Sequence, residues 1–185
     1  MQSKGKKALV ISWNNMQGAE GYEVYFAKCN GNGAKYKMIK TVNAGEPLKL
    51  KKKGLRKKCA YKAYVKAYAM KDGSKVYLGT SPAIHAYTSG SKGKCTNPKS
   101  VTVNQTAVSL TQGGTHQINA KVKKVKKSKK LIPASHEAAL RYLSSDDAVA
   151  TVSSSGVITA KAKGSCRIYV FSVNGVKTTV TVTVQ

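Results

Sequence analysis

Acidic residues are scarce in this sequence. Only 7 Asp and Glu stand against 33 Lys and Arg in 185 residues, so the formal net charge is +26. Catalysis by a pair of carboxylates therefore has almost no candidates. No apolar run approaches the roughly 18 residues that a membrane-spanning helix needs, which excludes a transmembrane helix. The apolar share of 41% is nevertheless enough for a packed core.

Motifs of catalytic and metal sites are also missing. The sequence has no nucleophile-elbow Gly-x-Ser-x-Gly, no P-loop and no dinucleotide-binding glycine pattern. The four cysteines show no Cys-x-x-Cys spacing and the three histidines are scattered, which disfavours a zinc site. We therefore expect a protein that is not an enzyme and that holds no metal or cofactor.

Helical periodicity is nearly absent, whereas strand patterns are frequent. No segment keeps apolar residues at i, i+3, i+4 and i+7 beyond about two turns. Residues 61–68 and 176–184 alternate in the way of half-buried strands. Turn sequences recur at short intervals, among them Asn30-Gly31-Asn32-Gly33, Asp72-Gly73 and Asn174-Gly175. This pattern predicts an all-β chain of antiparallel strands.

A small, polar stretch divides the chain. Residues 88–94 contain Ser, Gly and Lys without an apolar face, which is typical of a linker. We place a linker at 91–98 between a first unit, 1–90, and a second unit, 99–185. Each unit has about the size of an Ig-like sandwich, and both are basic.

The first unit carries a family resemblance in its strands and in one corner. Ile11-Ser12-Trp13 and residues 18–25 resemble the second and third strands of a fibronectin type III domain of the bacterial surface kind. Leu55 and Tyr61 resemble the tyrosine corner of that family, in which the phenol hydroxyl bonds to backbone a few residues upstream. The resemblance covers about residues 8–88 and implies a core that includes Trp13, Tyr22, Val24, Tyr61, Ala63 and Val65.

The type III resemblance also bears on the cysteines. In such a sandwich the end of the third strand lies beside the start of the sixth, which makes a disulfide between Cys29 and Cys59 possible. Lys57 and Cys59 depart from the family, which usually has Pro and Thr there. Cys166 shares strand parity with apolar neighbours, which indicates a buried thiol, and the pairing of Cys95 stays open.

The second unit resembles another family. Residues 144–152, with the pattern Ser-Ser-x-x-x-Val-Ala-x-Val, are followed by Gly156-Val157-Ile158-Thr159-Ala160 and a final hairpin bounded by Gly. This order is similar to the bacterial Ig-like domain of group 2. Tyr142 stands where that family often has Trp, and residues 123–137 form an insert.

The two resemblances together imply tandem Ig-like antiparallel β-sandwiches. The fibronectin type III-like domain comes first and the group 2 Ig-like domain follows. Such pairs imply an exported protein of the bacterial cell surface or cell wall. We expect the chain to be a monomer.

One face of the first unit alternates tyrosine with lysine. Strand parity places seven side chains on the outer face of one sheet: Tyr25, Lys62, Tyr64, Lys66, Tyr68, His85 and Tyr87. Tyr64 and Tyr68 are candidates for stacking on sugar rings or bases. Alternatively, Tyr is present only as a good strand former and Lys only keeps the face soluble.

Two dense lysine runs are the outstanding feature of the sequence. Their candidate anion-binding residues are Lys51, Lys52, Lys53, Arg56, Lys57 and Lys58 in the first unit, and Lys123, Lys124, Lys126, Lys127, Lys129 and Lys130 in the second. Such runs are either solvated loops or sites that attract a polyanion with salt-sensitive affinity. The candidate partners are wall teichoic acid, acidic or sulfated glycans, a host surface, anionic lipid headgroups and nucleic acid.

The sequence thus predicts a non-catalytic cell-surface module for adhesion or spacing, which binds anionic glycopolymers through basic loops. A purely structural spacer is a second hypothesis, because the charge can serve solubility alone. A non-specific nucleic-acid binder is a third. Sequence-specific recognition of nucleic acid is not expected, since no recognition helix, zinc finger or RNP aromatic pattern is present.

Overall fold

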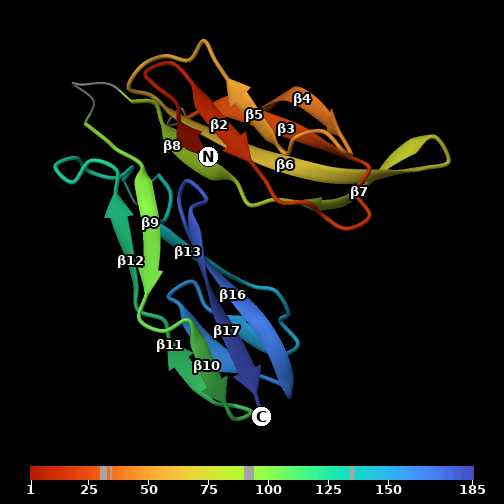
Figure 1. The fold of residues 1–185 in the computed structure, drawn as a ribbon, viewed down its shortest axis with the longest axis vertical. Coiled ribbons are helices and arrows are strands. Elements are labelled where there is room, and N and C mark those ends of the chain that lie inside the picture. The colour runs from red at the N-terminus through yellow and green to blue at the C-terminus, as the bar shows by residue number, and fades with distance from the viewer. Residues whose placement is uncertain (30–32, 34, 90–93, 134–135) are drawn as a thin grey trace. The chain divides into compact units, whose positions relative to one another are not determined.

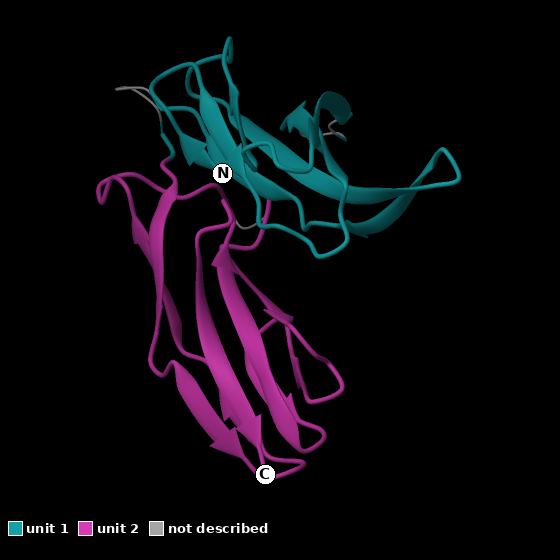
Figure 2. Ribbon diagram, turned by 45° about the vertical axis from the view of Figure 1, so that its right-hand side comes forward, with its two compact units in different colours: residues 1–95 teal, residues 96–185 magenta. Residues whose placement is uncertain are grey.

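The structure is a computed structural model that describes residues 1–29, 33, 35–89, 94–133 and 136–185. Every element of secondary structure in these ranges is a β-strand. No helix in them is long and apolar enough to cross a membrane. The chain forms two compact units, 1–95 and 96–185 (Figure 2). Residues 30–32 of the first predicted turn and 91–93 of the predicted linker lie outside the described residues.

The first unit has two sheets (Figure 1). One sheet has the order β1-β2-β5, with β1 at Gln2–Ser3, β2 at Leu9–Ser12 and β5 at Lys49–Lys52. The other has the order β4-β3-β6-β7, with β3 at Gly21–Lys28, β4 at Lys37–Asn43, β6 at Ala60–Lys71 and β7 at Ser74–Thr80. A further strand, β8 at Ile84–Tyr87, pairs with the start of β6, so β7 and β8 form one sheet edge in two pieces.

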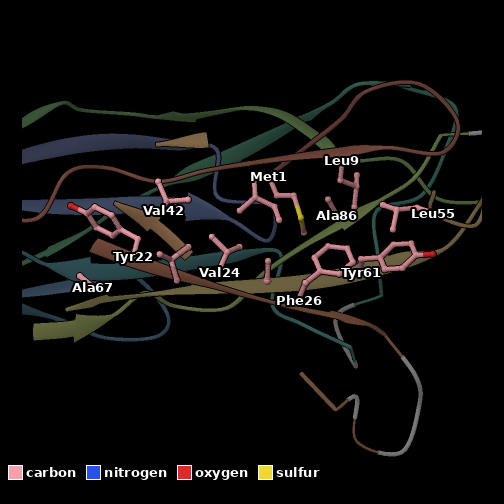
Figure 3. Close-up of a cluster of buried hydrophobic side chains, with 13 residues drawn as sticks. Met1, Leu9, Tyr22, Val24, Phe26, Val42, Leu55, Tyr61, Ala67 and Ala86 are labelled. Atoms are coloured by element: carbon pink, nitrogen blue, oxygen red, sulfur yellow. The ribbon is translucent and has the colours of Figure 1, made fainter. Parts of the chain in front are cut away.

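Alternation along β6 positions the core of the first unit. Tyr61, Ala63 and Val65 face inward and are buried, while Lys62 and Tyr64 face outward. The inward set belongs to one buried cluster with residues of β2 and β3. Figure 3 shows Tyr61 beside Phe26 of β3 in this cluster. The six core residues implied by the type III resemblance all belong to this cluster, with Trp13 at its partly buried margin.

The tyrosine corner is present. The main-chain N–H of Arg56 donates a hydrogen bond to the hydroxyl oxygen of Tyr61 over 2.9 Å, and Leu55 is buried in the same cluster. This contact and the strand order confirm the fibronectin type III-like sandwich that the sequence predicted.

The hairpin between β6 and β7 closes with the predicted turn. Asp72 and Gly73 have φ angles of 51° and 75°, the left-handed region in which two-residue hairpin turns match the strand twist. Glycine adopts this region without a steric cost, and Asp tolerates it better than most residues.

The second unit is also an all-β domain. Its elements are β9 (Pro98–Val103), β10 (Ala107–Leu110), β11 (Thr115–Gln117), β12 (Ala120–Lys124), β13 (Leu140–Ser144), β14 (Ala150–Val152), β15 (Val157–Ala160), β16 (Gly164–Ser172) and β17 (Lys177–Val184). Their sheet orders are β10-β17-β16-β13, β11-β15-β14 and β12-β9. The inward faces of these strands form a second core, which includes the buried thiol of Cys166 as predicted.

One strand pair departs from the expected antiparallel pattern. β10 and β17 pair in parallel, with Ala107 opposite Thr181 and Leu110 opposite Val184. The reason is the path of the chain. After β9, which pairs with β12, the chain passes through residues 104–106 and enters β10 in a different sheet, where its neighbour is β17, the last strand. The remaining strand pairs of both units are antiparallel.

The last hairpin, between β16 and β17, is held by a buried asparagine. Asn174 accepts a hydrogen bond from the Ser172 hydroxyl over 2.8 Å and donates one to the carbonyl of Pro98 over 3.1 Å. Gly175 follows with a φ of 83°. The turn predicted at Asn174-Gly175 is therefore confirmed, and its side chain also ties the hairpin to β9.

Candidate functional site

A row of tyrosine rings stands on the outer face of the β4-β3-β6-β7 sheet. Tyr25 on β3 and Tyr64 on β6 are directly opposite in the strand register, and their rings stack at 4.7 Å with an interplanar angle of 8°. Tyr36, which lies just before β4, packs against Tyr64 edge to face, also at 4.7 Å. Tyr25 and Tyr64 therefore cover one face of each other, and Tyr36 adds a third ring to the row.

Lysine ammonium groups lie over several of the rings on this face. The Nζ atom of Lys62 lies 4.8 Å from the centroid of Tyr36. The Nζ atom of Lys66 lies between two rings, 4.7 Å from the centroid of Tyr77 and 5.5 Å from that of Tyr25. These are cation–π distances, which fix where each ammonium group sits on the sheet.

A buried carboxylate organises one end of the row. Glu23 on β3 is only 4% exposed. Its Oε2 accepts hydrogen bonds from the hydroxyls of Tyr25 (2.8 Å) and Tyr77 (2.9 Å), and its Oε1 accepts one from the Lys75 ammonium (2.7 Å). The Lys75 hydrogen bond is the main cause that lowers the pKa of Glu23, against the opposing effect of burial. The hydrogen bond to Glu23 in turn raises the pKa of Tyr25.

The structure revises the stacking role that the sequence suggested for two tyrosines. Tyr68 is 6% exposed: its ring lies against Gly21 on the neighbouring strand, and the Lys75 ammonium lies 4.6 Å from its centroid. The ring of Tyr64 already stacks on Tyr25. Tyr68 therefore offers little surface for stacking, and one face of the Tyr64 ring is taken by Tyr25.

Strand parity located part of this face and missed the rest. Lys62 and Lys66 lie on it as predicted, and His85 lies opposite Lys62 in the register. Tyr77 and Tyr36 were missed. Tyr77 joins the face because β7 shifts register against β6 between Ala67 and Tyr68, and a shift of this kind leaves no local mark in the sequence.

The first lysine run is half strand and half turn, whereas a loop was expected. Lys51 and Lys52 lie in β5, the edge strand of the three-stranded sheet, opposite Val10 and Leu9 of β2. The backbone after Lys52 is held in place, because the Leu55 side chain is buried and its N–H donates to the carbonyl of Lys7 over 3.0 Å. Five of the six candidate residues are exposed: Lys51, Lys53, Arg56, Lys57 and Lys58.

The second lysine run also begins in a strand. Lys123 and Lys124 end β12, and the chain then turns, with the N–H of Lys129 donating to the carbonyl of Lys126. Thr96 fastens this turn, since its hydroxyl accepts from the N–H of Lys126 over 3.2 Å and its own N–H donates to the carbonyl of Lys130. Four of the six candidate residues are exposed: Lys123, Lys126, Lys127 and Lys130.

Cys29 and Cys59 are free cysteines, so the disulfide implied by the type III resemblance is not formed. The N–H of Cys29 donates to the carbonyl of Ala60, which places Cys29 opposite Ala60 rather than Cys59. Cys59 packs against the core, while the Cys29 sulfur lies 3.9 Å from Nδ1 of His85 on the outer face. The two thiols therefore point to opposite sides of one sheet.

The Cys29 thiol is not an activated nucleophile. Burial raises its pKa to about 11, against a smaller lowering by Lys62. The thiol is therefore protonated at neutral pH, even with an imidazole nearby.

Comparison with known families decides the nature of the second unit. Residues 98–184 match the family model of the bacterial Ig-like domain (group 2). The second unit is a domain of this family. The match begins at the first residue of β9 and ends with β17, so it spans the whole sandwich of this group 2 domain.

Tyr142 fills the place where group 2 domains often have Trp. Its ring lies over Gly156, where an added Cβ would come within 2.8 Å of the ring. Gly156 also has a φ of 86°, in the left-handed region that glycine favours. The aromatic residue and the glycine of the Gly-Val-Ile-Thr-Ala strand are therefore one packing unit of the group 2 domain.

Two solved structures align over most of the chain at low similarity. The fibronectin(III)-like modules of Clostridium thermocellum CbhA are 15% identical, with 100% of this chain and 88% of that chain covered and a TM-score of 0.34. A C-terminal 282-residue fragment of intimin, in complex with the intimin-binding domain of its translocated receptor, is 17% identical, with coverages of 95% and 56% and a TM-score of 0.35. No curated protein matches the sequence.

Proposed function

We propose that this chain is a non-catalytic module of a bacterial cell surface that binds anionic glycopolymers through its two lysine runs. The observation that carries the proposal is the exposure of Lys51, Lys53 and residues 56–58 beside a turn whose backbone is already ordered. A linear polyanion can contact several of these cations at once and release its counterions. The group 2 domain supports the surface setting.

The excess of cations supports attraction of a polyanion over internal pairing. The chain has 33 Lys and Arg but only 7 Asp and Glu, and one of those carboxylates, Glu23, is already bound to Lys75. Even if more of these cations formed ion pairs at the surface, such pairs would contribute little to stability, so the excess of Lys and Arg is not explained by stabilisation of the fold. It does create a field that raises the rate of encounter with anions.

Cosedimentation with purified Gram-positive cell walls tests the proposal. We expect saturable binding that weakens as salt rises and that is lost when the anionic polymers are stripped from the walls. The first variant replaces the six basic residues of 51–58 by Gln, which removes the charges while Leu55 and the backbone contacts of the turn stay. We expect this variant to lose most of the binding.

A matched control removes the same charge elsewhere. Its six Lys→Gln changes fall on exposed positions outside both runs: Lys28, Lys37, Lys40, Lys99, Lys161 and Lys163. Equal loss in the control and in the first variant would show general attraction instead of a site. Absence of binding to either wall preparation at physiological salt would favour the spacer hypothesis, and equal affinity for DNA of the same charge density would favour the nucleic-acid hypothesis.

A further inference from the structure

We propose that the outer face of the β4-β3-β6-β7 sheet is a second anion-binding site, in which Lys62 and Lys66 contact the ligand and tyrosine rings position their ammonium groups. The ligand class, a linear polymer that carries phosphate, sulfate or carboxylate groups, rests on the proposed function. The site itself rests on the tyrosine–lysine geometry, which is independent of the two lysine runs.

The charges on this face are available to a ligand. Glu23 is compensated locally by Lys75 at 2.7 Å and by two tyrosine hydroxyls. Neither Lys62 nor Lys66 pairs with a carboxylate among the residues that the structure describes. Both residues are half-buried, and their ammonium groups lie over aromatic rings.

The rings make these two lysines more effective than lysines on a turn. A freely rotating lysine must be immobilised when it binds, at a cost in conformational entropy. Lys66 is already held between Tyr25 and Tyr77, and Lys62 is already held over Tyr36. We therefore expect each of these two lysines to contribute more affinity than a lysine of residues 51–58.

The covered rings also decide the chemistry of the ligand. Stacking of a neutral sugar needs an open ring face, and the contact between Tyr25 and Tyr64 takes up one face of each of these rings. Ring edges carry the positive end of the aromatic quadrupole, so the edges and the ammonium groups attract the same sign of charge. The face is therefore better suited to anions than to neutral carbohydrate.

The spacing along β6 sets a minimum ligand length. Lys62 and Lys66 lie on the same face of one strand, four residues apart, so their Cα atoms are about 13 Å apart. A single phosphate can reach only one of them, whereas an oligomer that spans this distance can reach both. Affinity should therefore rise sharply once the oligomer is long enough to bridge the pair.

Calorimetry with glycerol phosphate oligomers of increasing length tests the site at fixed salt. The variant Lys62→Gln/Lys66→Gln is compared with Lys51→Gln/Lys53→Gln, which removes the same charge from exposed positions. We expect the first pair to weaken binding at least tenfold and to abolish the length threshold. The second pair should weaken binding about threefold or less and keep the threshold.

Variants that change a ring but no charge separate positioning from net charge. Tyr77→Leu should weaken binding several-fold, because Lys66 loses one of the rings that hold it, whereas Tyr77→Phe keeps the ring and should keep the affinity. Tyr169→Leu is the matched control, since Lys177 lies 4.7 Å from that ring in the other unit. Thermal unfolding of each variant checks that it is folded before its affinity is compared.

The outcomes separate this inference from the proposed function. Wild-type affinity in both the Lys62/Lys66 and the Tyr77→Leu variants, with loss only in the 51–58 variant, would overturn the second site and leave the proposed function intact. Failure of the wild-type protein to bind oligomers of any length and to bind cell walls would overturn both. Equal effects of Tyr77→Leu and Tyr77→Phe would overturn the positioning role of the ring.

Discussion

The hydroxyl oxygen of Tyr61, a core residue on β6, accepts a 2.9 Å hydrogen bond from the main-chain N–H of Arg56, which lies within the first lysine run. The basic turn is thus fastened to the interior by a phenol rather than by its own charged side chains. This explains how a segment of like charges can keep a defined backbone in spite of its self-repulsion.

Loss of that hydroxyl should loosen the turn at a modest cost. We expect Tyr61→Phe to lower the free energy of unfolding by about 1 kcal/mol, the usual net contribution of one such hydrogen bond. Hydrogen exchange at the Arg56 amide should accelerate by more than the global change in stability explains. Unchanged exchange at this amide, measured by NMR, would contradict the anchoring role.

The Glu23 network predicts a dependence of stability on pH. Because the pKa of Glu23 is lowered on folding, its contribution is present above the unfolded pKa, near 4.5, and is lost as the pH falls through the lower folded value. Glu23→Gln should therefore be less stable than wild type at pH 6 to 7, and the difference should shrink toward pH 3.

Urea unfolding at a series of pH values measures that difference. Glu20→Gln is the control, because it removes the same charge from an exposed position in the residue just before β3. A Glu20→Gln profile that matches the Glu23→Gln profile would mean that overall charge, and not the tyrosine and lysine contacts, produces the effect.

Gly21 and Tyr68 form a tight pair across β3 and β6. An added Cβ on Gly21 would overlap the phenol end of the Tyr68 ring on the opposite strand. We expect Gly21→Ala to cost about 1–3 kcal/mol of stability, as overpacking in a well-packed region does. The double variant Gly21→Ala/Tyr68→Ala should be more stable than the sum of the single changes predicts, because the clash is gone.

The free thiols predict a chemical result. With a pKa of about 11, Cys29 has about a hundredfold less thiolate at pH 8 than an ordinary thiol of pKa about 9. Iodoacetamide should therefore label Cys29 slowly in the native protein and rapidly in denaturant, as site-resolved mass spectrometry can measure. A Cys29–Cys59 disulfide in non-reducing peptide maps would contradict the register of β3 and β6.

Local patterns were enough to predict much of the fold. The alternation in residues 61–68 gave both β6 and its inward residues, and Asp72-Gly73 gave the hairpin, because both signals act within a few residues of the chain. β5 was not predicted, because the lysines at 49, 51 and 52 are typical of a solvated loop. An edge strand also tolerates lysines well, so the pattern does not distinguish the two.

The candidate site was harder to predict, because it depends on contacts between strands. Sequence parity placed Tyr64 on the outer face but could not say that Tyr25 covers its ring. The disulfide prediction was wrong for the same reason. The register places Cys29 opposite Ala60 and not opposite Cys59, and neighbouring residues of a strand point to opposite sides of the sheet. Register and ring contacts are set by packing across the whole sheet.

The parallel pairing of β10 with β17 has a mechanical consequence. When tension pulls the chain entering the group 2 domain away from the chain leaving it, these two strands are drawn in opposite directions along their length. Their hydrogen bonds are then loaded together in shear and cannot break one after another like a zipper. A module built in this way should resist stretching forces at a cell surface, and single-molecule pulling would measure that resistance as a high unfolding force.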